Sequence, residues 1–201
     1  MGYVSVATDI TERKRAEAQV RSAHHRVRLA LEQERDASRS DFLTGLTNRR
    51  AFYEMGEFEA KRAKRYKRSL TLLYIDVDNF KVVNDSLGHQ AGDDLLVQVA
   101  NTIKNGVRQT DIAARLGGDE FAVLLPETDA PGGTTVSTKL QQVLSAEMQK
   151  NGWPVTFSLG CVTSNETQLD FDDLVKEGDS LMYQSKKSGK NRCSVSRPTS
   201  P

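Results

Sequence analysis

The most constraining feature of this sequence is the stretch ARLGGDEFAVLLP at residues 114–126, where a Gly-Gly pair separates two apolar runs. Both glycines can adopt a positive φ without steric cost, so the pair predicts a tight β-hairpin. Two adjacent carboxylates, Asp119 and Glu120, follow the turn. Because the run from Phe121 to Leu125 is apolar enough to be buried, these acids predict a site that needs a cation or a proton, with a solvated loop tip as the alternative.

A second acidic cluster ends the apolar run YIDVD at residues 74–78. Side chains alternate along a strand, so Asp76 and Asp78 point to the same face, where two carboxylates favour a hard divalent cation. A calcium EF-hand loop is excluded, because Lys81 and Leu87 stand where that loop needs Gly and Glu. If the hairpin pairs beside this strand, Asp76, Asp119 and Glu120 share one pocket, as in two-metal phosphoryl transfer.

Helical and strand periodicities alternate through the rest of the chain. Helices are predicted at 47–68, with Phe52, Met55 and Phe58 on one apolar face, at 91–107 and at 171–187. Another helix follows the PGG at 131–133 and presents Val136, Leu140, Val143, Leu144 and Met148. Strands are predicted at 69–80 and 153–162. This order predicts an α/β sandwich with a mixed central sheet flanked by helices over residues 41–195, followed by a disordered tail at 196–201.

The N-terminal part differs in composition. Residues 11–40 are charged, rich in Ala and free of Gly and Pro, which predicts a long linker helix. Its a and d heptad positions hold Val20, Ala23, Val27, Ala30, Glu34 and Ala37, so two copies could pair as a coiled coil, with a single solvated helix as the alternative. Residues 1–10 alternate like a strand of a separate domain.

The composition limits which binding partners and which cellular location can be expected. The 28 basic and 27 acidic residues give a formal net charge of +1, which argues against binding a nucleic-acid polymer. The segment has no apolar run long enough to cross a membrane, although a longer protein could be tethered upstream. Cys161 and Cys193 have neither zinc nor disulfide spacing, so a cytoplasmic location is expected.

Five stretches in order resemble the GGDEF-domain diguanylate cyclases. They are DFLTGLTNRR at 41–50, DVDNFKVVNDSLGHQAGDD at 76–94, RLGGDEF at 115–121, VTFSLGC at 155–161 and SLMYQSKKSGKNR at 180–192. The resemblance implies a palm-like cyclase fold that condenses two GTP into cyclic di-GMP with release of two pyrophosphates. It also implies a homodimer, because each domain supplies one nucleotide. Residues 1–10 resemble the last strand of a PAS sensor domain, and 11–40 its signalling helix.

The resemblance implies that Asp76, the Val77 carbonyl and Asp119 hold Mg²⁺ or Mn²⁺, two ions per half-site, with Glu120 completing the acidic cluster. Asp119 or Glu120 would help to deprotonate the attacking ribose 3′-hydroxyl, and the sequence leaves both open. Both acids and Asp76 are present, which favours an active enzyme over the alternative, a catalytically silent module that binds GTP or cyclic di-GMP as a regulator.

Substrate-binding residues also follow from the resemblance. Asn84 and Asp93 would read guanine, since a carboxylate accepts from its N1 and N2 hydrogens, and this disfavours a palm enzyme that uses ATP. The turn amides of Asn79, Phe80 and Lys81, with the side chains of Lys81, Lys186 and Lys190, would hold the triphosphate. The family often has Arg where Lys190 stands, and Lys lacks the bidentate fork. Local alternatives remain: Asp93 as a helix N-terminal acid, Asn84 as a turn residue, Lys186 to Lys190 as a solvated helix end, and His89 as a structural or solvent-facing loop residue.

Arg108 and Asp111 occupy an RxxD tetrad where many such cyclases bind their own product as an inhibitor. A local Arg-Asp surface pair is the alternative. The basic run KRAKRYKR at 61–68 could assist that site or form a solvated helix face. Asp41, with Asn48 and Arg49, is expected to fix the junction between the linker helix and the domain.

Overall fold

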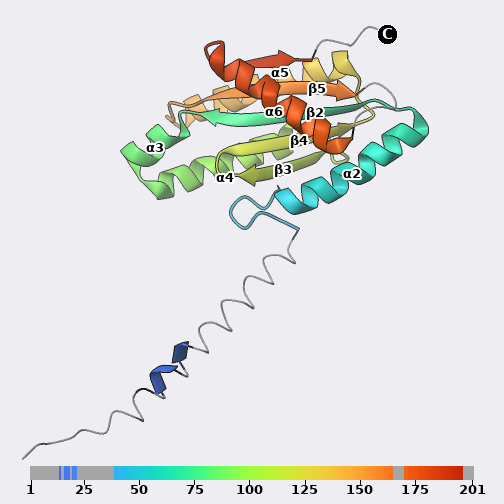
Figure 1. Cartoon of the computed structure of the whole chain (residues 1–201). Helices are drawn as coiled ribbons and strands as arrows, with labels where there is room; N and C mark the ends of the chain where they lie inside the picture. The colour runs from blue at the N-terminus through green and yellow to red at the C-terminus, as the bar shows by residue number, and fades with distance from the viewer. Residues whose placement is uncertain (1–13, 15, 19, 22–38, 165–169, 197–201) are drawn as a thin grey trace, which may run out of the picture. The chain divides into compact units, whose positions relative to one another are not determined.

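The computed structural model describes residues 14, 16–18, 20–21, 39–164 and 170–196 (Figure 1). Contacts divide the chain into two units, Met1–Ser38 and Arg39–Pro201. The described residues of the first unit are helical but too few to test the long helix predicted at 11–40. The strand predicted at 1–10 and residues 197–201 of the predicted tail lie outside the described residues. None of the helices in the described part of the chain is long and apolar enough to span a bilayer.

The second unit is built on a six-stranded mixed sheet with the order β1-β3-β4-β2-β5-β6. The strands are β1 (Thr47–Asn48), β2 (Leu70–Asp78), β3 (Ile112–Gly117), β4 (Glu120–Pro126), β5 (Thr156–Ser164) and β6 (Arg192–Val195). The central strand β2 pairs antiparallel with both β4 and β5, while β1 and β6 run parallel to β3 and β5. β3 and β4 form the predicted hairpin.

Helices cover both faces of this sheet (Figure 1). Residues of α2 (Arg49–Tyr66) and α6 (Phe171–Lys187) share one buried apolar cluster with one face, and residues of α4 (His89–Gly106) and α5 (Ala130–Lys150) share another with the opposite face. The short α3 (Phe80–Leu87) connects β2 to α4. The predicted sandwich with a mixed sheet flanked by helices is confirmed.

Alternation along β2 decides where the site lies. Leu73, Ile75 and Val77 belong to the cluster shared with α4 and α5, whereas Leu72 and Tyr74 belong to the cluster shared with α2 and α6. By the same alternation, Asp76 and Asp78 continue the α2 and α6 side, so the end of α6 can reach them.

Several predicted elements need correction. The helix predicted from Thr47 begins at Arg49, because Thr47 and Asn48 pair with β3 and the Asn48 side chain caps the helix by accepting from the Ala51 amide. Phe58 is 65% exposed and not part of the apolar face, since it lies about 120° around the helix from the buried Phe52. Val143 is likewise exposed on α5. The sequence analysis did not predict α3 or β6.

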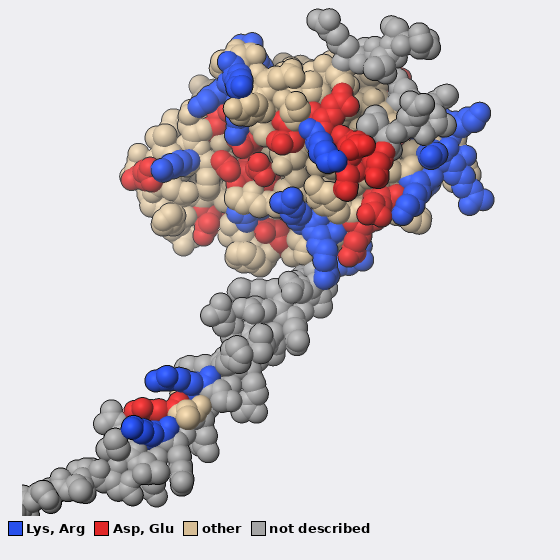
Figure 2. Space-filling view, viewed as in Figure 1, with Lys and Arg blue, Asp and Glu red and all other residues tan. Residues whose placement is uncertain are grey.

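Charges of both signs are interspersed on the face of the domain drawn in Figure 2. This agrees with the near balance of 28 basic and 27 acidic residues. The surface seen there carries no large field of one sign that would favour a polyanion.

Candidate active site

Two of the predicted acids lie directly opposite each other on neighbouring strands. Asp76 near the end of β2 is the register partner of Glu120 at the start of β4. The Asp76 side chain is only 5% exposed, and Asp119 and Glu120 are half-buried. Directly opposed strand residues have their Cβ atoms about 5 Å apart, so the predicted grouping of Asp76 with the GGDE acids is what the sheet produces.

The turn between β3 and β4 presents Asp119. Gly117 and Gly118 have φ of 146° and 53°, and both values are ones that side-chain-bearing residues rarely adopt. The Val77 amide donates to the Asp119 carbonyl at 3.2 Å, which extends the ladder between β2 and the hairpin into the turn. The backbone of Asp119 is therefore fixed beside Val77, leaving its carboxylate next to the end of β2.

A lysine from α6 closes the acidic cluster. Lys186 Nζ lies 2.7 Å from Asp76 Oδ2. The pKa of Asp76 is raised to about 6, chiefly by burial; the hydrogen bond and charge of Lys186 oppose this rise, and the charges of Asp119 and Asp78 add to it. Burial lowers the pKa of Lys186, but the hydrogen bond and charge of Asp76 outweigh it, so the net shift is upward. Lys186 is thus not part of a solvated helix end.

Tyr74 is a site residue that sequence reasoning missed. Its hydroxyl donates to Glu120 Oε2 at 3.2 Å, and burial together with the charge of Glu120 raises its pKa. The available signal was alternation, since Tyr74 precedes Asp76 by two residues and faces the same side of the sheet. Tyr74 orients one oxygen of Glu120 in the acidic cluster.

Asp78 requires a correction. Its side chain belongs to the same face as Asp76, as predicted, but its carboxylate is fully engaged by neutral donors. Oδ1 accepts from Ser158 Oγ at 2.8 Å, and Oδ2 accepts from Thr156 Oγ1 at 2.8 Å and from the Asn191 amide at 3.2 Å. The pair of Asp76 and Asp78 is therefore not a cation site. Among the described residues, no three His, Cys, Asp or Glu side chains form a metal-binding group.

The predicted triphosphate residues gather at the turn after β2. Asn79 adopts a left-handed conformation with φ of 64°, and Phe80 and Lys81 begin α3. Lys190 Nζ donates to Asn79 Oδ1 at 2.8 Å although the two residues are 111 positions apart. The Lys81 side chain is exposed. Two of the three predicted lysines, Lys186 and Lys190, thus converge on the end of β2.

Asn84 and Asp93 lie on adjacent helices. Asn84 is half-buried on α3, and Asp93 is exposed on α4. A Cβ at Gly92 would collide with the Asn84 side chain, so glycine is what allows α4 to approach it. Both local alternatives fail, since Asn84 is inside a helix and Asp93 lies beyond the first turn of α4. His89 is exposed, as expected, but it is the first residue of α4 and not part of a loop.

The RxxD tetrad borders a separate hollow of about 610 Å³ that Lys104, Arg108 and Asp111 help to line. Asp111 Oδ2 accepts from the Arg108 backbone amide at 2.8 Å, and Oδ1 is buried without a hydrogen-bond partner in the described structure. Burial raises the pKa of Asp111. No ion pair joins the two side chains in the described part of the chain, but the amide and the charge of Arg108 act on Asp111, so a local Arg-Asp pair stays an alternative to the product site.

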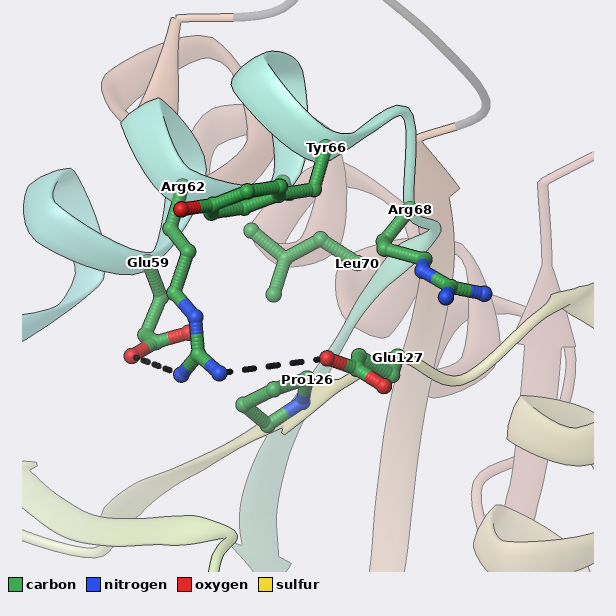
Figure 3. A pocket seen from close by; sticks show the side chains of 8 residues that line it. Glu59, Arg62, Tyr66, Arg68, Leu70, Pro126 and Glu127 are labelled. Atoms are coloured by element: carbon green, nitrogen blue, oxygen red, sulfur yellow. Dashed lines mark hydrogen bonds and ion pairs between the residues drawn. The ribbon is translucent and has the colours of Figure 1, made fainter.

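The basic run at 61–68 does not reach that hollow. Figure 3 shows the narrow cleft that it borders instead, where Arg62 bridges Glu59 and Glu127 beside Tyr66 and Pro126. The cleft has room for only about 10 Å³ and so holds no nucleotide. The run is a solvated helix end.

Asp41 and Arg115 connect the start of the domain to the GGDE turn. Arg115 Nη1 lies 3.2 Å from Asp41 Oδ1, and Arg115 Nε and Nη2 donate to the Gly118 carbonyl at 3.0 and 2.8 Å. Asp41 also accepts from the amide and hydroxyl of Thr44. Burial raises the pKa of Asp41, but these hydrogen bonds and the Arg115 charge outweigh it, so the net shift is downward.

The fold and site define an α/β domain of the palm type with a carboxylate cluster at the end of its central strand. The family model for the diguanylate cyclase GGDEF domain matches residues 38–192, and the chain belongs to this family. Diguanylate cyclase DgcM of Escherichia coli K12 is 35% identical over 188 residues, which cover 93% of this chain and 42% of DgcM. The chain therefore spans less than half the length of that relative.

Two solved structures show the same fold. The coiled coil and GGDEF domain of DgcB from Caulobacter crescentus, in complex with c-di-GMP, has a TM-score of 0.70 and 27% identity over 94% of this chain and 100% of its own. The active GGEEF domain of a diguanylate cyclase from Vibrio cholerae has a TM-score of 0.71 and 28% identity over 77% of this chain and 99% of its own.

Proposed function

We propose that this chain is a diguanylate cyclase that condenses two GTP into cyclic di-GMP and two pyrophosphates. The observation that carries the proposal is the opposition of Asp76 and Glu120 across β2 and β4, with Asp119 at the adjoining turn. Such a cluster suits phosphoryl transfer, where carboxylates hold divalent cations against substrate phosphates. The name of DgcM, a diguanylate cyclase, and the c-di-GMP in the DgcB structure support the same activity.

The donor chemistry fits magnesium or manganese. Asp76 is buried among acids that raise its pKa, and a divalent cation would relieve the same repulsion that Lys186 now offsets. The proposed ligands are the carboxylates of Asp76 and Asp119 with the Val77 carbonyl, and Glu120 lies beside them. When bound, the metal ions would neutralise the phosphates and stabilise the attacking and leaving oxygens.

The chain's own residues supply position and charge. Lys186 and Lys190, with the amides of Asn79 to Lys81, hold the triphosphate, while Asn84 and Asp93 accept and donate at the guanine edge. Asp119 or Glu120 accepts the proton of the ribose 3′-hydroxyl. Tyr74 keeps one Glu120 oxygen oriented through its hydrogen bond of 3.2 Å. Two such domains face each other, so that a hydroxyl from one nucleotide aligns with the α-phosphate of the other.

The decisive test is to incubate the protein with GTP and Mg²⁺ and to separate the nucleotides by chromatography. The Asp119→Ala variant is expected to form cyclic di-GMP roughly a thousand-fold more slowly. Glu57→Ala is the matched control, because Glu57 is an exposed acid that pairs only with Lys61 among the described residues. GTP binding without turnover in the wild type would identify the silent regulatory module instead.

We also propose that the hollow at Arg108 and Asp111 binds the product as an inhibitor. The unpaired, buried Asp111 Oδ1 can accept from the guanine N1 and N2 hydrogens, and the exposed Arg108 guanidinium can contact phosphate or the guanine edge. Arg108→Ala is expected to raise the concentration of cyclic di-GMP needed for half-inhibition by roughly ten-fold or more while initial rates stay unchanged. The control is Arg62→Ala, since Arg62 lies outside this hollow. Unchanged inhibition in Arg108→Ala would remove the assignment.

The N-terminal part is proposed to be the end of a PAS-type sensor at 1–10 and a signalling helix at 11–40 that pairs with a second copy. The heptad spacing of Val20, Ala23, Val27 and Ala30 supports the pairing. A related arrangement is named for DgcB, whose coiled coil and GGDEF domain align with 94% of this chain.

A further inference from the structure

We propose that Asp78 is a positioning residue that fixes the phosphate-binding loop of Lys190, an inference that rests on the proposed GTP site. Asp78 is the last residue of β2 and is only 2% exposed. A buried carboxylate is costly unless its oxygens are hydrogen-bonded. Here both carboxylate oxygens accept hydrogen bonds. One of the donors is the amide of Asn191, which lies in a loop 113 positions after Asp78.

That loop needs an anchor. It joins α6 to β6, and both Lys190 and Asn191 adopt left-handed conformations, with φ of 61° and 48°. Such conformations are unfavourable for residues with side chains, so surrounding contacts must impose them. Asp78 Oδ2 holds the Asn191 amide at 3.2 Å, and the Lys190 amide donates to the Ser185 carbonyl at 3.1 Å.

The end of β2 holds the loop at a second point. Asn79, the residue after Asp78, accepts from Lys190 Nζ at 2.8 Å. The two contacts together fix the backbone at 191 and the ammonium group at 190. Since Lys190 carries a single ammonium on a flexible stem and not a planar fork, the direction of its charge depends on the loop that carries it. Asp78 therefore acts on the triphosphate through Lys190, without itself touching substrate or metal.

Substitution at two positions separates this role from general stability. Asp78→Ala removes the acceptor for the loop amide. Asp78→Asn keeps the shape, because its carbonyl oxygen can accept from Asn191 and Thr156 while its amide donates to the Ser158 hydroxyl. Ser158→Ala is the matched control, since it removes a hydrogen bond to Asp78 Oδ1 and leaves the Asn191 contact in place.

The experiment is calorimetric titration of the full chain with guanosine and with a GTP analogue in which a methylene group replaces the α,β-bridging oxygen and prevents pyrophosphate release. The dissociation constant of guanosine divided by that of the analogue reports how much the triphosphate alone contributes to binding. Asp78→Ala is expected to reduce this ratio by about ten-fold with guanosine affinity unchanged, and Asp78→Asn to stay within about three-fold of the wild type. Ser158→Ala is expected to lower the melting temperature and leave the ratio unchanged.

Each outcome decides between distinct claims. If Asp78→Asn lowers the ratio of the dissociation constants as much as Asp78→Ala does, the carboxylate acts by its charge and the positioning role is wrong. An unchanged ratio in Asp78→Ala, or an equal loss in Ser158→Ala, also overturns it. If Asp78→Ala does not fold, Asp78→Asn and Ser158→Ala still test the role, because both are expected to keep the ratio of the wild type and a loss of the ratio in either of them contradicts it. A wild type that binds the analogue no more tightly than guanosine contradicts the GTP site itself.

Discussion

At the scale of the residue, the ionised form of Asp76 lowers the stability of the folded domain. Burial, followed by the neighbouring acids and against Lys186, raises its pKa to about 6 from the ordinary value of 3.8. Because the folded-state pKa lies above the unfolded one, the favourable contribution of this group is fully present below about pH 4 and is lost as the pH rises through about 6. At neutral pH the ionised carboxylate therefore destabilises the fold, which is the condition in which it could attract a cation.

Asp76→Asn is accordingly expected to abolish cyclase activity and yet to raise the melting temperature at pH 8 without metal. The upper bound of the gain is about 3 kcal/mol, reduced by the lost ion pair with Lys186. The gain should shrink towards zero near pH 5, where the wild-type group is protonated. Melting curves from pH 5 to 8 test this, with Asp172→Asn, an exposed acid of α6, as the control. A gain independent of pH would contradict the raised pKa.

Melting curves with and without Mg²⁺ test whether the acidic cluster binds the metal. Adding Mg²⁺ at pH 8 is expected to raise the melting temperature of the wild type, because ligand binding to the folded state stabilises it, and chelation should reverse the effect. Asp76→Asn, which lacks one proposed ligand, should gain much less. An equal rise in both proteins would place the Mg²⁺ elsewhere.

At the scale of the element, the sequence predicted those parts whose pattern is local. The hairpin of β3 and β4 follows from Gly117 and Gly118, and α6 from its apolar spacing with the bounds that the structure has. The short β6 was missed because its pairing with β5 leaves little periodicity in four residues. The role of Asp78 was misread because its partners Thr156, Ser158 and Asn191 are 78 to 113 positions away.

The junction of Asp41 with the GGDE turn gives a prediction at this scale. The guanidinium of Arg115 contacts both Asp41 and the carbonyl of Gly118 in the turn, and the Arg115 side chain is only 11% exposed. Arg115→Lys keeps the charge but cannot contact Asp41 and Gly118 together, so we expect roughly a ten-fold loss of kcat with the fold intact. Arg62→Lys is the matched control, because Arg62 also bridges two groups, the carboxylates of Glu59 and Glu127, but its side chain is 51% exposed. Equal effects of the two substitutions on activity would show that the turn does not depend on this contact.

At the scale of the whole molecule, the proposed binding of one nucleotide beside one acidic cluster per domain would require two copies for a cyclic product. The sequence predicts pairing of the linker through the heptad spacing within residues 11–40, but it predicts two catalytic domains facing each other only through the family resemblance. A dimer of half-sites has a consequence that a self-sufficient monomer lacks. A chain with a defective acidic cluster should inactivate any wild-type chain that it pairs with.

Mixing therefore tests the assembly. Adding an equal amount of Asp119→Ala to the wild type, with time for exchange, is expected to reduce cyclic di-GMP formation to about half, because random pairing leaves only about a quarter of the dimers fully wild-type. Asp119 lies at the turn and not in the apolar clusters of the core, so the variant should fold and pair normally. Adding wild-type protein instead should at least double the rate, and an inert protein should leave it unchanged. If the rate is also unaffected by Asp119→Ala after exchange has been verified with labelled chains, each chain completes the reaction alone and the dimeric mechanism is wrong.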